Sequence, residues 1–200
     1  MGYYQTPKKL GHMDRVERAE HNAASKETLT QHDLVGVTIV AQVETKLDEY
    51  RLGAEGMKRK ELAAEQHQSS RLATHMAIAG DPKPHACCHA HAIVSGGHKE
   101  AAPMRTILAH HKLRIDDSYN GCWLPENTKA KQVMPERLRH AVPHSRIHRF
   151  NYYFWLGRLI NMSITPTQDD LKYTLKTIGY ELQAGVQPFY VMKKKGEGIA

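Results

Sequence analysis

Two groups of histidines stand out in this 200-residue chain, because imidazole nitrogens bind divalent metal ions. The first group lies in the run from Pro84 to Gly97, whose metal-capable side chains are His85, Cys87, Cys88, His89 and His91. The second group lies later in the chain, at a four-residue spacing, and consists of His140, His144 and His148. That spacing predicts a helix with the three imidazoles on one face, and two such groups suggest one shared ion.

An i, i+4 pair on a helix supplies two nitrogens on one side of a rigid frame, and His144 and His148 have that spacing. A third nitrogen from His91, on a strand facing the helix, leaves at least one coordination position open for water or phosphate. An open position is typical of a catalytic metal site.

The elements that must position these residues follow from the pattern of apolar, glycine and proline residues. A short strand is expected over 85–94 and a second over 120–125, which begins at Asn120-Gly121 and ends at a proline. Helices are expected at 14 onward, 30–53, 57–79, 103–111, from Pro143 through Ile160, and 165–185, with a strand-like piece at 189–192. The fold class predicted is α+β, mainly helical.

The break at Gly80-Asp81-Pro82 suggests a division of the chain. Residues 1–80 are expected to form a helical N-terminal extension that packs on the core, with an unstructured leader at residues 1–13. Residues 81–200 are expected to form the domain that carries the chemistry.

The composition is that of a globular chain with a basic surface. It has 28 Lys and Arg against 21 Asp and Glu, a formal net charge of +7, and no apolar run near the roughly 18 residues of a membrane span. The excess of positive charge favours a polyanionic partner. Three cysteines, two of them adjacent, are not a disulfide framework, and with no signal peptide the chain is expected to be made in a cytoplasm with reduced thiols.

Several ordered motifs together resemble one nuclease family. They are Ala90-His91-Ala92-Ile93-Val94, Ala102-Pro103-Met104-Arg105-Thr106-Ile107-Leu108, Asn120-Gly121-Cys122-Trp123-Leu124-Pro125, His144-Ser145-Arg146-Ile147-His148 and Tyr152-Tyr153. In this order, over roughly residues 85–185, they are similar to the AHH family of the HNH/Endonuclease VII superfamily. The resemblance implies a ββα-metal core and metal-assisted hydrolysis of phosphodiester bonds.

Position by position, the resemblance implies that His91 is the strand ligand of one divalent ion, Mg, Zn or Ni, and that His144 and His148 are the helix ligands. Asn120 corresponds to the asparagine that ties the loop between the strands and so orients the active-site histidines. Nearby basic side chains could contact phosphates of DNA, namely Lys129, Lys131, Arg137, Arg139, Arg146 and Arg149.

The chain departs from the family at one position. A second histidine follows the first in the family and acts as general base, whereas this chain has Ala92. A methyl group accepts no proton, and loss of a general base typically slows a reaction by about 10²–10⁴-fold. Either this is an inactivated form of a toxic nuclease or a neighbour such as His89 or His98 takes the role, and we favour the first, because the other motif positions are intact.

The family is common as the toxic domain of bacterial polymorphic toxins and type VI secretion effectors. The resemblance therefore implies an antibacterial DNA endonuclease that is cytoplasmic in its producer and is delivered through a secretion-system component into the cytoplasm of a target cell. It also implies a cognate immunity protein, and the basic surface predicts an acidic contact face on that protein. No membrane partner is expected.

Two other interpretations come from different classes of protein. The first is a non-catalytic, zinc-stabilised nucleic-acid-binding module, with Cys87, Cys88, His89 and His91 as ligands. Adjacent cysteines argue against this site, because consecutive side chains on a strand point to opposite faces. The second is a DNA-binding domain without catalysis, which the basic composition supports equally well.

Overall fold

The computed structural model describes residues 14–198 of the chain. Contacts divide the chain into two compact units, Met1–Glu49 and Tyr50–Ala200. The sequence placed a division at residue 80 instead, and by contacts residues 50–80 belong to the second unit. The domain boundary stays a prediction, and the leader expected at residues 1–13 lies outside the described residues.

The first unit consists of helix α1 (Arg15–Ala24) and the first part of helix α2 (Gln31–Gly56). Asp14 and Glu17 cap α1 reciprocally: the Glu17 N–H donates to Asp14 at 2.8 Å and the Asp14 N–H donates to Glu17 at 3.0 Å. At the start of α2 the Thr30 N–H donates to the Asp33 carboxylate at 3.0 Å.

The second unit is a two-stranded sheet surrounded by helices. In chain order its elements are α3 (Arg59–Ala63), α4 (Ser69–Ile78), β1 (Cys88–Ala92), the 3₁₀ helix η2 (Lys99–Ala101), α5 (Ala102–His110), η3 (Ser118–Asn120), β2 (Gly121–Pro125), η4 (Ala130–Val133), η5 (Glu136–Leu138), η6 (His144–Arg146), α6 (Phe150–Leu159), α7 (Gln168–Ala184) and η7 (Phe189–Met192). The mainly helical α+β fold class is therefore confirmed.

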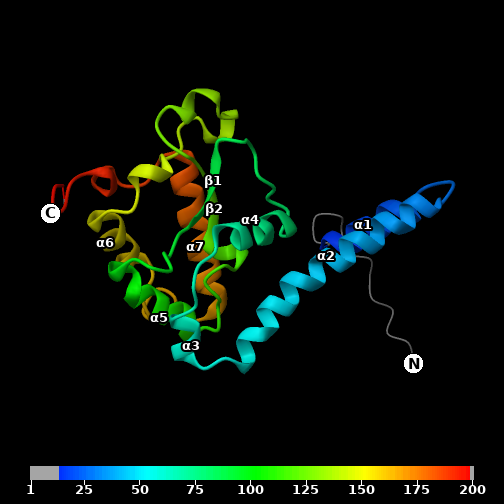
Figure 1. The fold of residues 1–200 in the computed structure, drawn as a ribbon, viewed down its shortest axis with the longest axis horizontal. Coiled ribbons are helices and arrows are strands. Elements are labelled where there is room, and N and C mark those ends of the chain that lie inside the picture. Colours follow the sequence, from blue (N-terminus) through cyan, green and yellow to red (C-terminus); the bar gives the residue numbers. More distant parts are fainter. Residues whose placement is uncertain (1–13, 199–200) are drawn as a thin grey trace. The chain divides into compact units, whose positions relative to one another are not determined.

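Strands β1 and β2 form an antiparallel hairpin with His91 opposite Cys122 and Ala92 opposite Gly121. Helix α4 packs on both strands and α7 packs on β2 (Figure 1). The two helices cover opposite faces: a Cβ on Gly121 would meet the Met76 Sδ of α4 at 2.6 Å, whereas Cys122, the next residue, meets Gly179 of α7. The hairpin is thus buried on both sides, which fixes its register and its histidines.

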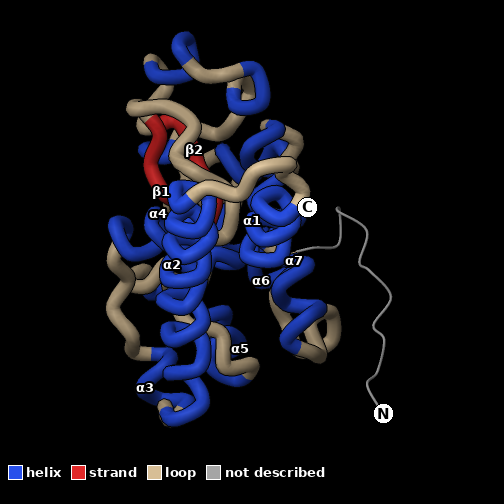
Figure 2. Tube along the Cα trace, turned by 90° about the vertical axis from the view of Figure 1, so that its right-hand side faces the viewer, coloured by secondary structure: helices blue, strands red, loops and turns tan. Residues whose placement is uncertain are grey.

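Three expected elements differ from the structure. The helix expected over 57–79 is interrupted at 64–68, the helix expected from Pro143 begins only at Phe150, and residues 189–192 form a 3₁₀ helix in place of a strand. The connection after β2 is mostly loop with short helical turns (Figure 2). The Asn151 side chain donates to the Tyr190 carbonyl at 2.8 Å, so a contact with α6 fixes the backbone at 189–192.

No helix within residues 14–198 combines the length and the apolar character that crossing a membrane requires.

Candidate metal and nuclease site

His91 is held at the centre of the second unit by the hairpin. It lies one residue before the end of β1, and its side chain is fully buried. Because side chains alternate along a strand, His91 and Cys122 share the face covered by α7, while Ala90, Ala92 and Gly121 share the face covered by α4. The sequence placed His91 on a strand, and the structure agrees.

His144 and His148 reach the site from a segment that is not an α-helix, so the expected helical pair is wrong in its backbone. Pro143 precedes the single 3₁₀ turn of η6, and Arg149 has extended dihedral angles (φ −126°, ψ 163°) before α6 starts. The buried Ile147 anchors this turn in the core. His140, the third member of the expected helical face, lies outside the cluster.

The three predicted ligands nevertheless meet. One ring nitrogen from each of His91, His144 and His148 lies within 4.8 Å of the others, which makes them a group able to hold one ion. The ring centroid of His91 lies 5.4 Å from that of His144 and 5.1 Å from that of His148. We call these three residues the histidine cluster.

Tyr152 determines which nitrogen of His91 can bind a metal. The Tyr152 hydroxyl donates to the Ile93 carbonyl at 2.8 Å, so its oxygen must accept the proton of His91 Nε2, 3.0 Å away. Nδ1 of His91 then carries a lone pair, and this buried atom has no hydrogen-bond partner among residues 14–198. A buried lone pair without a donor is costly, and a metal ion in the cluster would satisfy it. The donor set therefore fits a divalent ion.

Tyr153 acts in a similar way on His148. Its hydroxyl lies 2.9 Å from Nδ1 of His148, which leaves Nε2 free for the cluster. The ring of His98 stacks on Tyr153 with the centroids 4.2 Å apart. A hydrogen bond to the second ring nitrogen is the usual way in which proteins orient metal-binding histidines.

The surroundings keep the cluster neutral. Burial lowers the pKa of His91 well below 6.5, and repulsion from His148 and His144 acts in the same direction. Burial, followed by repulsion from His148, lowers the pKa of His144 to about 4. The pKa of His148 is also lowered, first by burial and then by His98. Neutral imidazoles at pH 7 are the form that binds metal ions.

Asn120 ties the loop after β1 to the segment before β2, as the sequence predicted. Its Oδ1 accepts from the Val94 N–H at 2.8 Å, and its Nδ2 donates to the carbonyls of Val94 at 3.1 Å and Ile115 at 2.8 Å. Asn120 is fully buried. These three bonds fix the chain that continues from His91.

Ala92 occupies the position at which the general base was expected. It is buried, and it lies on the face covered by α4, opposite to the face of His91. Of the neighbours suggested as substitutes, His89 lies beside the cluster, with its ring centroid 5.3 Å from that of His144, and His98 lies behind Tyr153.

The ligand set of the zinc-module interpretation is not assembled. Among the described residues, the group of donors close enough to share an ion is the histidine cluster, which includes neither Cys87 nor Cys88. Cys88 is buried with its Sγ 3.4 Å from the sulfur of Met134, and burial raises the pKa of its thiol.

The six basic residues expected to bind DNA differ in their contacts. Arg137 pairs with Asp81 at 3.3 Å and Arg139 with Glu136 at 2.7 Å. Lys131 and Arg149 donate to backbone carbonyls, at 3.5 and 3.4 Å. Lys129 and Arg146 are exposed, and neither forms an ion pair within residues 14–198. Their role toward DNA stays a prediction.

His67, in the segment between α3 and α4, was not predicted from the sequence as a site residue. Repulsion from the protonated form of His67 makes a small contribution to the lowered pKa of all three histidines of the cluster. His67 precedes every motif used above, and a lone histidine in a polar segment carries no signal of its own.

A family model matches residues 72–171, and its description is a nuclease family of the HNH/ENDO VII superfamily with a conserved AHH motif. The match covers half of the chain, including the hairpin, the cluster and both tyrosines. The chain belongs to the AHH family. Its second unit therefore carries a nuclease domain whose expected substrate is nucleic acid, and nucleases of this superfamily use divalent metal ions. No curated protein and no solved structure matches the chain.

Proposed function

We propose that this AHH domain is a metal-dependent endonuclease that hydrolyses phosphodiester bonds of DNA. The observation that carries the proposal is the histidine cluster, with the unpartnered Nδ1 of His91 at its centre. A purely structural packing of three histidines gives no reason to leave that buried atom without a partner.

His91, His144 and His148 would hold the ion, and imidazole nitrogens suit Zn²⁺ or Ni²⁺ better than Mg²⁺. When bound, a divalent ion supplies stabilisation of the negative charge that develops on the phosphate. Tyr152 and Tyr153 hold two of the rings so that the free nitrogens converge, and the buried hairpin keeps His91 in place. The ligands are thus positioned before any ion arrives.

We further propose that this form of the enzyme is impaired. In the family the residue after the first histidine takes a proton from the attacking water, and the methyl group of Ala92 cannot. The rest of the site is assembled, so the expected loss is that of one base, about 10²–10⁴-fold in rate.

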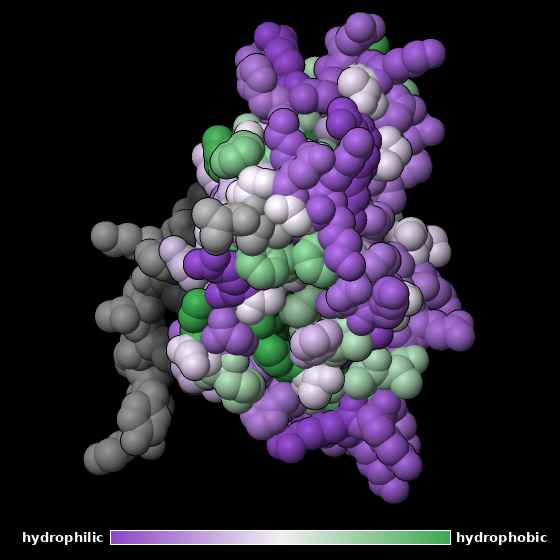
Figure 3. Space-filling view, turned by 90° about the vertical axis from the view of Figure 1, so that its left-hand side faces the viewer, coloured by the Kyte–Doolittle hydropathy of each residue, from purple (hydrophilic) through white to green (hydrophobic). Residues whose placement is uncertain are grey.

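The surface charge supports a polyanionic substrate. The net charge is +7, and Lys129 and Arg146 are exposed on the connection that leads into the cluster. Hydrophilic side chains cover most of the face drawn in Figure 3, with apolar residues in smaller patches. Contacts from such residues would position the phosphate backbone without reading sequence.

We also propose the biological setting that the family resemblance suggests: an antibacterial effector, exported through a type VI or related secretion system and neutralised in its producer by an immunity protein. The net positive charge supports an acidic contact face on that protein. An immunity protein with a basic contact face that does not inhibit DNA cleavage would contradict the proposal of an acidic immunity protein.

The test is cleavage of supercoiled plasmid by the parent chain and by the variant Ala92→His, with Mg²⁺, Zn²⁺ or Ni²⁺ and with EDTA. We expect the variant to cut at least about 10²-fold faster than the parent, only with metal. The double variant His91→Ala with Ala92→His is the control and should not cut. If the Ala92→His variant binds one ion and still fails to cut DNA or RNA, the nuclease proposal is wrong.

A further inference from the structure

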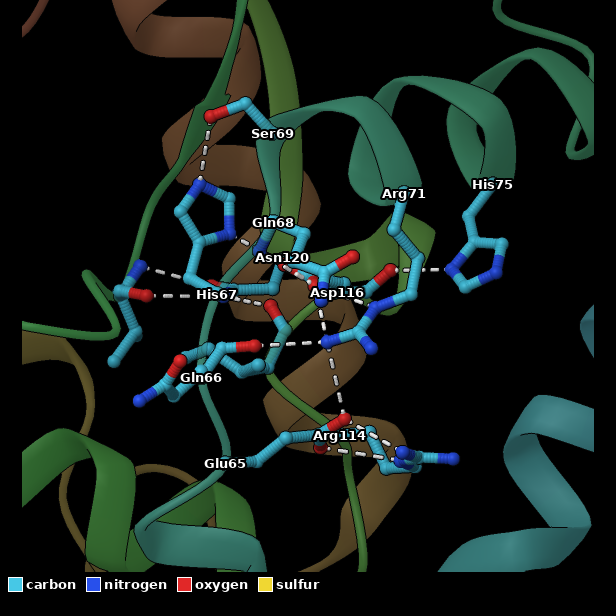
Figure 4. Close-up of polar contacts among 12 residues, drawn as sticks. Glu65, Gln66, His67, Gln68, Ser69, Arg71, His75, Arg114, Asp116 and Asn120 are labelled. Atoms are coloured by element: carbon cyan, nitrogen blue, oxygen red, sulfur yellow. Dashed lines mark hydrogen bonds and ion pairs between the residues drawn. The ribbon is translucent and has the colours of Figure 1, made fainter.

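His67 and Asp116 form a hydrogen-bonded pair in which the carboxylate is buried and the imidazole is partly exposed. Nδ1 of His67 hydrogen-bonds to the Asp116 carboxylate, which is fully buried. The same carboxylate accepts from the Gln68 N–H at 2.9 Å and from Arg71 Nε at 2.7 Å (Figure 4). Burial alone would raise the pKa of Asp116, but these hydrogen bonds, with that from His67 first, outweigh it, and the pKa is lowered. Asp116 is therefore a fixed anion.

This anion sets the tautomer of His67. A carboxylate only accepts, so Nδ1 of the neutral ring carries the proton and Nε2 carries the lone pair. Nε2 lies 3.2 Å from the Ser69 hydroxyl, on the side of the ring away from Asp116 (Figure 4). The His67 side chain is 23% exposed and Ser69 is exposed, so water can reach this nitrogen. A histidine oriented by a carboxylate, whose Nε2 carries a lone pair beside an exposed hydroxyl, has the geometry of a general base.

The backbone of His67 is fixed to the hairpin that carries His91. A Cβ on Gly96, in the loop after β1, would lie only 2.5 Å from Cβ of His67, so the two chain segments touch there and glycine is required. Asn120 binds both Val94 of this loop and Ile115, the residue before Asp116. One hydrogen-bonded frame therefore holds the cluster and the His67–Asp116 pair.

A groove runs from Ser69, the hydrogen-bond partner of His67, to His144 of the cluster. Its volume is about 330 Å³, and its lining includes Ser69, Ser70, His89, Ala90 and His144. Nε2 of His67 contacts the hydroxyl of Ser69, and Ser69 lines this groove. Ala92 belongs to the same α4-covered face of β1 as Ala90, and its partner Gly121 contacts Leu72, one helical turn after Ser69. His67 thus approaches from the side on which the missing base would stand.

The other histidines nearby lack this arrangement. Within residues 14–198, neither His89 nor His98 contacts a carboxylate, and Nδ1 of His98 accepts from the Glu100 N–H. His75 shows what a structural histidine in this region looks like: it is buried, and its Nδ1 bonds to the backbone carbonyl of Asp116 at 2.7 Å. His67 differs because it is partly exposed and its second nitrogen contacts the exposed Ser69 hydroxyl.

We propose that His67 is the general base that serves this site in the absence of an imidazole at position 92, and that Asp116 is its positioning residue. The inference rests on the proposed nuclease function. Nε2 of His67 takes a proton from water, and the water oxygen forms a bond to phosphorus. The bond between phosphorus and the 3′ oxygen breaks, and this oxygen takes a proton from solvent. His67 then returns its proton to solvent, so no further reactant is consumed.

The experiment compares cleavage by the parent and by His67→Gln, Asp116→Asn and the matched control His75→Gln, each with one equivalent of bound metal. We expect the parent to cut slowly and His67→Gln to lower kcat further, by up to about 10²-fold, with KM unchanged. A general base supplies about 10²–10⁴-fold in all, and Ala92→His is expected to restore at least about 10²-fold of it. Asp116→Asn should lower kcat, and His75→Gln should cut at the parent rate. In the Ala92→His background, His67→Gln should have little effect, because a base is then present at position 92.

A second measurement needs no substitution of His67 or Asp116. Long-range ¹H–¹⁵N correlation spectra of the metal-free parent should show His67 protonated at Nδ1 and bare at Nε2; the opposite tautomer would overturn the proposal even if His67→Gln fails to fold. The role of His67 is refuted if Ala92→His cleaves DNA but the parent does not cut, or cuts no faster than His67→Gln. The nuclease function would still stand in that case. Failure of Ala92→His with metal bound refutes both.

Discussion

Removing the Tyr152 hydroxyl, with Tyr152→Phe, tests whether the cluster is built around Nδ1 of His91. The hydroxyl joins two buried groups: it accepts from His91 Nε2 at 3.0 Å and donates to the Ile93 carbonyl at 2.8 Å. Phenylalanine fills nearly the same volume, so the change removes two hydrogen bonds and little packing. It also frees the ring of His91 to change tautomer.

The magnitude follows from the groups left behind. A buried donor or acceptor without a partner costs about 1–3 kcal/mol, and Tyr152→Phe leaves two of them, so we expect a loss of about 2–6 kcal/mol in the free energy of unfolding. The other tautomer of His91 gives no relief, because Nδ1 also lacks a partner. Loss of the hydrogen bond that orients a metal-binding histidine typically weakens metal affinity about 10–100-fold.

Two assays read these effects separately. Urea unfolding of the metal-free protein gives the stability, and titration with Zn²⁺ or Ni²⁺ followed by calorimetry gives the affinity. Tyr173→Phe is the matched control, because Tyr173 is 76% exposed on α7 and should change neither quantity. If Tyr152→Phe binds metal as tightly as the parent, the assignment of Nδ1 of His91 as a ligand atom is wrong.

Two further predictions concern stability. Gly185→Ala should destabilise the protein by about 2 kcal/mol or more, because Gly185 ends α7 at φ 72° and a Cβ there would lie 2.3 Å from the His140 carbonyl oxygen; urea unfolding beside Gly56→Ala, where a Cβ meets nothing, checks this. The metal-free protein should lose stability as pH falls from 6.5 to about 4, because the pKa of His144 is lowered to about 4 and the unfolded chain binds the proton first. A urea midpoint equal at pH 7 and pH 5 would contradict this.

Part of the fold could be predicted because local chemistry determined it. The last helix has Thr167 and Asp170 as a reciprocal cap at its start and Gly185 in the left-handed conformation at its end, and both signals are in the sequence. The second strand was correct for a similar reason, since a turn precedes it and Pro125 ends it. Such boundaries depend on residues that are neighbours in the chain.

The wrong elements depend on distant contacts. The helix expected over 57–79 is interrupted at 64–68, where Asp116, far away in the sequence, accepts the Gln68 N–H and binds His67. The helix expected from Pro143 is replaced by the 3₁₀ turn of η6, with the buried Ile147 packed into the core. The periodicity of apolar residues indicates which face of a helix is buried. It does not indicate where a buried carboxylate will accept a hydrogen bond from a backbone N–H and so interrupt the helix.

The histidine cluster shows why the three predicted residues come together although the predicted backbone was wrong. Position i+4 lies on the same side as position i in an α-helix. The 3₁₀ turn of η6, followed by Ile147 in the right-handed helical conformation, also brings His148 to the side of His144, with ring centroids 5.4 Å apart. Without an α-helix, the pair needs another source of rigidity, and Tyr153 supplies it from the first turn of α6. The paired tyrosines therefore do what a helical backbone would have done: each fixes one ring so that a nitrogen without a partner faces the shared position.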